Sequence, residues 1–425
     1  MPSVRVDAAH ILQAVLEDKV FFGELKKQIP EKDLPFLNML ILTALRHLIP
    51  LNTVLAQFIR KKIAHKNRLA HYLLVLATAE ILYMNTAPYA VINETVGAIR
   101  RTTDKFLANM ANAVLRQIAA QKNDLWQQAE KISPLPPTFT EILAGYTADE
   151  TAQIAQSVYQ IPPLDITVKA NPTASAEKFG AQILPNGTLR LPENTKITAL
   201  SDFEKSAWVQ DVAAGFPVQL LGDIKGLKAV DLCAAPGGKT AQLAAAGAHV
   251  QAIDISASRL QTLQENMQRL NFTDVEIINA DALQFLQSTD EQFDVILLDA
   301  PCSATGTFRR HPEVLHIKTA ADVAAQVQLQ SRLLEACGRV LRIGGVLMYS
   351  VCSICKKEGE EQIAAFLQNH QNFKIVPLKM TALETHGRWQ QNMVTPDGTL
   401  RTLPFYEAQK GGMDSFFICK MQRII

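Results

Sequence analysis

Residues 231–240, with the sequence Asp-Leu-Cys-Ala-Ala-Pro-Gly-Gly-Lys-Thr, form the stretch of the chain best suited to binding a small ligand. An apolar run, 227–232, precedes it and an Ala/Leu-rich stretch, 240–246, follows it, so we predict a strand, a tight turn and a helix. Gly237 and Gly238 let the backbone approach a ligand closely. The first amides of the helix are N–H donors without intrahelical partners, which suits an anionic or carboxylate group.

Two nucleotide-binding motifs are alternatives for this stretch. A phosphate-binding P-loop ending in Lys239 and Thr240 would need its first glycine at position 233, where the chain has Cys233. Residues 295–299 would still make a plausible second motif of an NTPase, so hydrolysis of a nucleoside triphosphate remains an alternative. A nicotinamide site is disfavoured because the G-x-G-x-x-G spacing is absent.

Acidic residues stand at the ends of the next predicted strands. Asp254, Asp281 and Asp299 each end or closely follow an apolar run. Ligands of open parallel sheets bind at the carboxyl ends of the strands, and dinucleotide folds place a ribose-binding carboxylate where Asp254 stands. Each of these residues could instead cap a helix, and for Asp281 the two interpretations are equally good.

Two cysteine motifs lie further along the chain, Asp-Ala-Pro-Cys-Ser-Ala-Thr-Gly at 299–306 and Tyr-Ser-Val-Cys-Ser-Ile at 349–354. They resemble the two cysteine motifs of the RNA cytosine-5 methyltransferases, and 231–240 resembles that family's S-adenosylmethionine-binding motif. A cysteine alone is more often a small buried apolar residue. Two cysteines at the ends of successive predicted strands, after a cofactor motif, are a far more specific indication of this family.

The resemblance implies a covalent reaction for which cysteine is well suited. Carbon 5 of cytosine is a poor nucleophile, and a thiolate that adds to carbon 6 makes carbon 5 enamine-like. By resemblance Cys352 is the attacking residue, and Cys302 assists loss of the carbon 5 proton and release of the enzyme. Asp299 would hydrogen-bond the base and stabilise charge during the addition. Lys239 resembles the family lysine near the base and the methionine.

The implied cofactor is S-adenosylmethionine. Asp254 would hold its ribose hydroxyls, Asp281 would meet the adenine edge, and Asp299 also belongs to this site. Arg259 matches a family arginine, for which a structural role is favoured. The turn supplies the remaining expected cofactor-binding residues: Cys233, Ala234, Ala235, Pro236, Gly237, Gly238 and Lys239.

One loop departs from the family pattern. Glu358 stands where the family has a Glu-Asn pair, but Gly359 replaces the asparagine and Lys356 replaces the preceding proline. The resemblance therefore assigns no role to this loop.

The expected partner is RNA. The formal net charge of +1 does not by itself indicate nucleic acid, but Arg309 and Arg310 follow the first cysteine motif and are placed to bind an RNA backbone. A second basic cluster, 60–68, is weaker evidence because charge runs are usually solvated helix faces. The target base must leave its stack to reach a cysteine, so we expect a loop or a partly assembled RNA as substrate.

No metal, disulfide framework or membrane segment is expected. The six cysteines are unevenly spaced, and the pair Cys352 and Cys355 has no second pair with ligand spacing. No apolar run approaches the roughly 18 residues of a membrane span, and the first ten residues lack a signal-peptide pattern. We therefore expect a soluble, cytoplasmic monomer.

The chain is predicted to be multidomain. Residues 1–132 show helical periodicity, and 88–94 and 109–116 resemble the antitermination factor NusB and the NusB-like domain of some bacterial ribosomal RNA methyltransferases. That resemblance implies RNA or ribosome-precursor docking; a structural or dimerising bundle is the alternative. A linker with short helices, 133–163, and a small α/β, RRM-like subdomain, 164–221, follow. Residues 222–425 alternate strands and helices, as in a Rossmann-like class I methyltransferase domain.

The two resemblances together imply an enzyme that methylates carbon 5 of a cytidine in 16S ribosomal RNA. One alternative is a transfer RNA methyltransferase with the same cysteines. Another is an RNA-binding assembly factor with an inactive methyltransferase core. The presence of Asp299, Cys302 and Cys352 argues against this last alternative.

Overall fold

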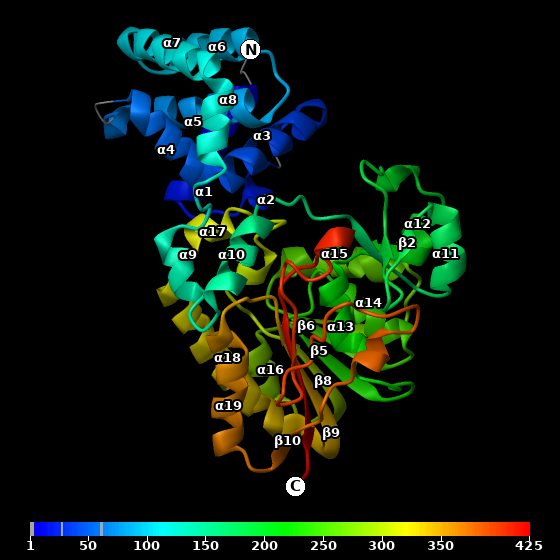
Figure 1. Cartoon of the computed structure of the whole chain (residues 1–425). Coiled ribbons are helices and arrows are strands. Elements are labelled where there is room, and N and C mark those ends of the chain that lie inside the picture. The colour runs from blue at the N-terminus through cyan, green and yellow to red at the C-terminus, as the bar shows by residue number, and fades with distance from the viewer. Residues whose placement is uncertain (1–3, 27–28, 60–62) are drawn as a thin grey trace. The chain divides into compact units, whose positions relative to one another are not determined.

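The computed structural model describes residues 4–26, 29–59 and 63–425 (Figure 1). The chain forms two compact units. The first, called the helical unit below, comprises Met1–Glu141, Ala155–Tyr159 and Arg310–Lys318. The second, called the α/β unit, comprises Ile142–Ile154, Gln160–Arg309 and Thr319–Ile425. The segments α9 (Pro137–Ile142) and α10 (Ala148–Ser157) are divided between them.

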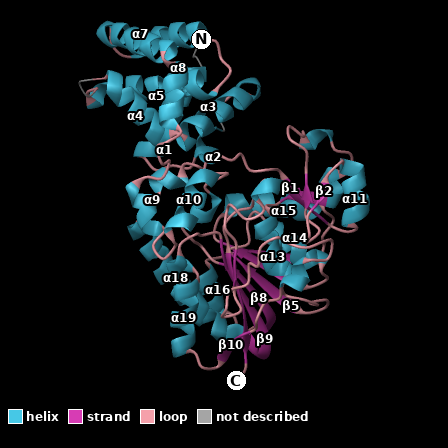
Figure 2. Ribbon diagram, in the orientation of Figure 1, coloured by secondary structure: helices cyan, strands magenta, loops and turns pink. Residues whose placement is uncertain are grey.

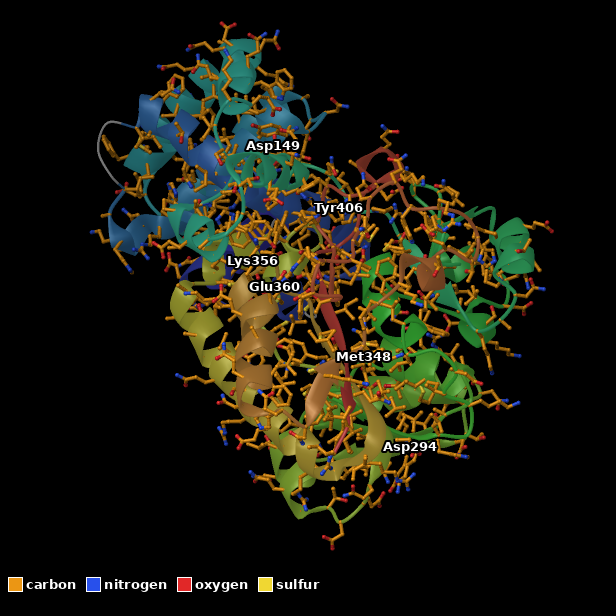
Figure 3. All side chains as sticks on the ribbon, turned by 60° about the horizontal axis from the view of Figure 1, so that its bottom comes forward. Asp149, Asp294, Met348, Lys356, Glu360 and Tyr406 are labelled. Carbon is orange, nitrogen blue, oxygen red and sulfur yellow. The ribbon has the colours of Figure 1, made fainter. Side chains whose placement is uncertain are left out.

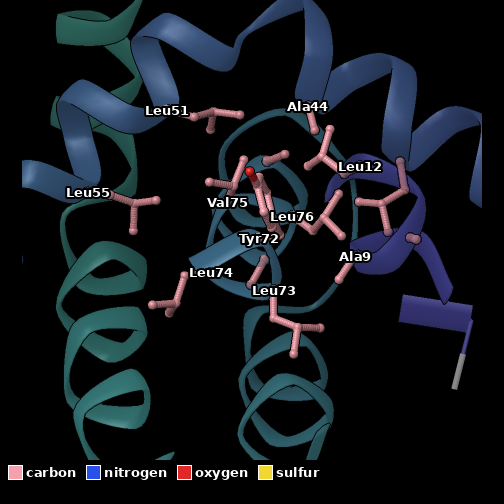
Figure 4. Close-up of a cluster of buried hydrophobic side chains, with 14 of the residues drawn as sticks. Ala9, Leu12, Ala44, Leu51, Leu55, Tyr72, Leu73, Leu74, Val75 and Leu76 are labelled. Atoms are coloured by element: carbon pink, nitrogen blue, oxygen red, sulfur yellow. The ribbon is translucent and has the colours of Figure 1, made fainter. Parts of the chain in front are cut away.

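The helical unit is built around α5 (Arg68–Tyr83), which is buried along most of its length. Its apolar side chains meet those of the surrounding helices on several sides, as Figure 4 shows for Leu73, Leu74, Val75 and Leu76. Glu80 of α5 is a fully buried carboxylate, and Arg5 of α1 binds it with two hydrogen bonds of 2.7 and 2.8 Å. The other helices of this bundle are α1 (Val4–Glu17), α2 (Phe22–Leu25), α3 (Leu34–Arg46), α4 (Leu48–Phe58), α6 (Pro88–Thr102), α7 (Lys105–Ala120) and α8 (Lys122–Ala129).

A segment from far along the chain completes the helical unit. The short helix α17 (Val314–Ile317) buries Val314, Leu315 and Ile317, and Ile317 belongs to the same apolar core as α5. The buried carboxylate of Glu313 accepts a hydrogen bond from the backbone N–H of Phe22. Ring nitrogen Nε2 of His316 lies 2.8 Å from the carbonyl oxygen of Leu45.

The α/β unit contains a small antiparallel sheet with the order β2-β3-β1-β4. Its strands are β1 (Asp165–Val168), β2 (Gln182–Ile183), β3 (Leu189–Arg190) and β4 (Ala207–Val209). The helices α11 (Pro172–Phe179) and α12 (Phe203–Ser206) contribute Phe179 and Phe203 to its apolar core.

The large sheet of this unit, whose strands are magenta in Figure 2, has the order β10-β12-β9-β8-β5-β6-β7, with β11 paired to β12. Five strands are parallel: β5 (Lys228–Leu232), β6 (His249–Asp254), β7 (Val275–Asn279), β8 (Phe293–Asp299) and β9 (Leu341–Val351). Three C-terminal strands pair antiparallel: β10 (Phe373–Ile375), β11 (Leu400–Arg401) and β12 (Phe417–Arg423). The strand order reverses beside β5, where the ligand crevice of an open α/β sheet is expected.

Helices cover both faces of the large sheet because side chains alternate along each strand. On β5, Val230 and Leu232 face a core shared with α18, whereas Ala229 faces a core shared with α13 and α14. The long helix α18 begins with a capping box between Thr319 and Asp322. The helices that cover the two faces are α13 (Val212–Gln219), α14 (Gly238–Ala245), α15 (Ala257–Arg269), α16 (Ala282–Ser288), α18 (Ala320–Val340) and α19 (Glu360–Asn369).

Within the described ranges, no single helix is long and apolar enough to cross a membrane. One bent pair, Glu31–Arg46 with Leu48–Phe58, passes that test by length and composition. Its apolar residues Leu37, Leu40 and Leu51 are fully buried in the helical unit.

Candidate active site

The turn at 231–240 connects β5 to α14 as predicted from the sequence. Gly237 has a φ of +100°, and a Cβ atom there would lie 2.8 Å from Cγ of Leu263. Glycine is therefore required at this position by both conformation and space. The backbone N–H of Ala234 donates to the carbonyl of Ile253 on β6, at 3.0 Å, which anchors the turn beside the end of that strand.

Asp254 ends β6 and points its carboxylate into this turn. Oδ2 accepts a hydrogen bond from the N–H of Ala235 at 3.1 Å, and Oδ1 accepts one from Ser256 at 2.9 Å. Its side chain is 2% exposed. Arg259 donates to the carbonyl of Ala235, and its Nη1 lies 3.7 Å from Oδ2 of Asp254. Arg259 thus braces the turn, and its contact with the cofactor stays a prediction.

Asp281 is the N-cap of α16. Its carboxylate accepts a hydrogen bond from the N–H of Gln284 at 2.9 Å. The helix-capping role considered for this residue is therefore present, and its contact with the adenine edge stays a prediction.

Lys239, in the first turn of α14, forms an ion pair with Asp299 at the end of β8. Nζ of Lys239 lies 2.7 Å from Oδ2 of Asp299, and the hydroxyl of Ser350 donates to Oδ1 at 2.8 Å. Burial lowers the pKa of Lys239, but the charge and hydrogen bond of Asp299 outweigh it, so that the pKa is raised overall. Lys239 therefore carries its positive charge at neutral pH.

The two motif cysteines lie side by side at the ends of the neighbouring strands β8 and β9. Their sulfur atoms are 3.3 Å apart, and both side chains are partly buried. The hydrogen bond with Cys352, burial and the nearby charge of Glu358 raise the pKa of Cys302 well above its usual value. Cys302 is therefore a neutral thiol at neutral pH, and its S–H can donate to Cys352.

A third cysteine, Cys233, lies in the turn at 231–240. Burial, together with the charges of Asp299 and Asp254, raises the pKa of Cys233 to about 12. Its thiol is therefore unreactive at neutral pH, because the thiolate is the nucleophilic form. Burial also raises the pKa of Cys355.

Arg309 differs from its sequence-based prediction as an RNA contact. The side chain is fully buried, and Nη2 donates to the carbonyl of Gly411. It ties two loops of the α/β unit together and is not accessible to an RNA phosphate in this conformation. Arg310 is half-buried and stays a predicted RNA contact. In the basic cluster at 60–68, residues 60–62 lie outside the described residues.

Three serines of this region were not singled out in the sequence, and Glu358 was named there without a role. Ser350 binds Asp299, and Glu358 binds both Ser303 and Ser353, the residues that directly follow the two cysteines. The repeated Cys-Ser pair was the available signal, but a serine after a cysteine is too common to interpret alone. Among the residues that the structure describes, no group of three or more His, Cys, Asp or Glu side chains is arranged to hold a metal ion.

Comparison with known proteins places this chain in a family. The family described as 16S rRNA methyltransferase RsmB/F matches residues 219–422, and the NusB family matches residues 2–120. The ribosomal RNA small subunit methyltransferase B of Yersinia pestis is 35% identical over 410 residues, covering 92% of this chain and 93% of that protein. The chain belongs to the RsmB/F methyltransferase family. The protein of the same name from Yersinia pseudotuberculosis matches to the same extent.

Solved structures agree with the RsmB/F assignment at the level of fold. The structure titled PH0851 covers 99% of both chains with a TM-score of 0.77 at 23% identity. A methyltransferase homolog protein from Pyrococcus horikoshii covers 68% of this chain and 100% of its own, with a TM-score of 0.53 at 26% identity. The predictions of family, fold class and RNA methyltransferase activity are thus confirmed.

Proposed function

We propose that this RsmB/F protein transfers a methyl group to carbon 5 of a cytidine in 16S ribosomal RNA through a covalent bond between Cys352 and the base. The observation that carries the proposal is the pair of cysteine sulfur atoms 3.3 Å apart beside the ion pair of Lys239 and Asp299. The 16S substrate is supported by the description of the family and by the names of the curated relatives. We also retain the division of the chain at 132, 163 and 221 as a proposal.

The residues of the turn fit S-adenosylmethionine as the methyl donor. Each oxygen of the buried Asp254 carboxylate accepts one backbone N–H and keeps a second acceptor position, so the pair can receive two ribose hydroxyls. Side-chain-free Gly237 and Gly238 let a ligand approach the backbone, and Asp281 supports the adenine edge. S-adenosylmethionine, when bound, supplies an electrophilic methyl group.

The cysteine pair supports a division of labour in the reaction. The thiolate of Cys352 forms a bond to carbon 6, and the electron pair of the ring double bond moves toward carbon 5. Cys302 holds its proton at the start and donates it as a hydrogen bond to Cys352. When the bond between Cys352 and carbon 6 breaks, Cys302 passes this proton to the departing sulfur of Cys352 and takes up the proton of carbon 5. Its raised pKa makes the Cys302 sulfur a stronger base for that proton than an ordinary cysteine.

Asp299 and Lys239 support the addition step. Asp299 keeps its carboxylate partly exposed at the strand end, where it can accept a hydrogen bond from the amino group of the base. Lys239 brings a positive charge close to Cys352 and can stabilise negative charge that develops during the addition. Preorganised charges of this kind are usually the largest single contribution to lowering a barrier.

The test uses Cys302→Ala, incubated with S-adenosylmethionine and unmodified 16S RNA or, separately, unmodified transfer RNA. A slowly migrating protein–RNA adduct on a denaturing gel with 16S RNA alone is expected. An adduct with transfer RNA alone would retain the mechanism and reassign the substrate. Absence of an adduct with either RNA, from a folded protein that binds the cofactor, would favour the assembly-factor alternative. Cys352→Ala serves as the control and should form no adduct while binding the cofactor normally.

A further inference from the structure

Glu358 is a fully buried carboxylate six residues beyond Cys352, at the end of the short 3-10 helix Lys356–Glu358. Lys356 and Glu360, two residues before and two residues after Glu358, are labelled in Figure 3. Oε1 accepts hydrogen bonds from the N–H of Ser303 at 2.8 Å and from Nε2 of Gln330 at 3.0 Å. Oε2 accepts hydrogen bonds from the hydroxyls of Ser303 and Ser353. A buried carboxylate is costly unless it is well hydrogen-bonded, and four donors compensate it here.

Three of these four donors belong to the two cysteine motifs. Ser303 directly follows Cys302, and Ser353 directly follows Cys352. The carboxylate of Glu358 therefore binds the serine that follows each cysteine. The two loops also meet directly, because the hydroxyls of Ser303 and Ser353 lie 3.3 Å apart.

Two further elements, α18 and β9, also hold Glu358 in place. Gln330 of α18 donates both to Glu358 and, at 2.8 Å, to the carbonyl of Pro301 in the first cysteine motif. The hydroxyl of Tyr349 on β9 donates to the backbone carbonyl of Glu358 at 2.7 Å. Glu358 thus cannot shift without moving β9, α18 or the cysteine loops.

We propose that Glu358 is a positioning residue for methyl transfer: by binding Ser303 and Ser353 together, it holds the Cys302 and Cys352 sulfur atoms at the spacing that the reaction uses. This inference rests on the two-cysteine mechanism proposed above. Displacing a reacting group by about 1 Å can cost about 100-fold in rate, so a tie between the two loops has kinetic consequences.

The first test compares Glu358→Ala and Glu358→Gln with Glu361→Gln. Glu361 is an exposed glutamate three residues away, so its variant makes the same change of charge without touching the network. We expect kcat for RNA methylation to fall by about 10- to 100-fold in Glu358→Ala, with KM for RNA within about twofold of wild type. Glu361→Gln should match wild type. Binding of S-adenosylmethionine should be unchanged in all three, because the network does not touch the turn at 231–240.

A second test measures the geometry without catalysis. Diamide, an azo oxidant, takes two electrons and two protons from a pair of thiols as their disulfide forms, and is itself reduced to the hydrazine. Mass spectrometry of the Cys302–Cys352 cross-linked peptide gives the rate of that reaction. Since Glu358 also raises the pKa of Cys302, each rate is divided by the rate of Cys302 alkylation at the same pH. We expect this ratio to be equal for wild type and Glu361→Gln, and several-fold smaller for Glu358→Ala.

A third measurement separates positioning by a charged group from simple packing. Glu358 helps to raise the pKa of Cys302, so Glu358→Gln should move the pH profile of Cys302 alkylation to lower pH. A residue that only filled space would leave this profile in place. If Glu358→Ala does not fold, Ser303→Ala and Ser353→Ala are used in its place in the same assays. Each of them removes one hydroxyl that donates to Glu358.

The inference is overturned if Glu358→Ala, or the two serine variants, keep the kcat of Glu361→Gln and its ratio of cross-linking to alkylation. Failure of the underlying function would look different, because wild type itself would then form no 5-methylcytosine. In that case the ratio of cross-linking to alkylation would still report whether Glu358 sets the sulfur spacing.

Discussion

Replacing Asp254 by asparagine changes one oxygen of a buried carboxylate into an amide nitrogen without changing its shape. In the native protein each oxygen accepts a backbone N–H, one from Ala235 and one from Ser256. An asparagine side chain can accept only one of these bonds. Whichever way it is oriented, the other backbone N–H faces an N–H₂ group.

The magnitude follows from these two bonds. A buried donor left without an acceptor costs about 1–3 kcal/mol, so the free energy of unfolding of the ligand-free protein should fall by about that amount. The cofactor should lose charge-assisted bonds from its ribose hydroxyls as well, which weakens binding by about 1–3 kcal/mol, or about 5- to 150-fold in Kd.

Urea denaturation without ligand and calorimetric titration with S-adenosylmethionine measure the two effects separately. Asp290→Asn is the matched control, since Asp290 is an exposed aspartate in the loop before β8. A cofactor Kd for Asp254→Asn within twofold of that control would refute the ribose assignment, even if the protein were destabilised. Equal stability of the two variants would refute the argument from the backbone donors.

Three further predictions concern the same unit. Gly237→Ala should destabilise the protein by about 2–4 kcal/mol, because its φ of +100° and the 2.8 Å approach to Leu263 both disfavour a Cβ atom; urea denaturation midpoints equal to wild type would contradict this. Burial raises the pKa of Asp231 to about 7, so its neutral form stabilises the fold at low pH and that stabilisation is lost as pH rises from about 4 to 7. Wild type should therefore lose up to about 4 kcal/mol relative to Asp231→Asn across this window, and parallel pH–stability curves for the two proteins would be incompatible with it. Tyr146→Phe removes the 2.8 Å hydrogen bond to the carbonyl of Ile354, and should lower the free energy of unfolding by about 0.5–1.5 kcal/mol in thermal melts, with no change expected if that bond is not formed in solution.

Sequence reasoning was most informative where function depends on residues at strand ends. The apolar runs before Asp254 and Asp299 correspond to β6 and β8, because buried parallel strands leave a clear apolar pattern. Cys302 and Cys352 were placed at the ends of successive predicted strands, and their sulfur atoms lie 3.3 Å apart. The chemical roles of these residues stay predictions.

Other features depend on contacts that no local pattern encodes. Arg309 was expected to face RNA, but its burial depends on Gly411, about one hundred residues further along the chain. Glu358 was assigned no role because its neighbours depart from the family pattern, yet its four hydrogen bonds come from three separate segments. Long-range polar networks of this kind become visible only when the chain is folded.

The segment Arg310–Lys318 bears on how the protein folds during synthesis. The helical unit begins at the N-terminus, but its core lacks Ile317 and its buried acceptor Glu313 until translation has passed residue 318. At typical rates of translation this segment is made roughly 10 to 35 seconds after residue 141. A nascent chain arrested before residue 310 should therefore carry a helical bundle that is more sensitive to protease than the same bundle in the finished protein.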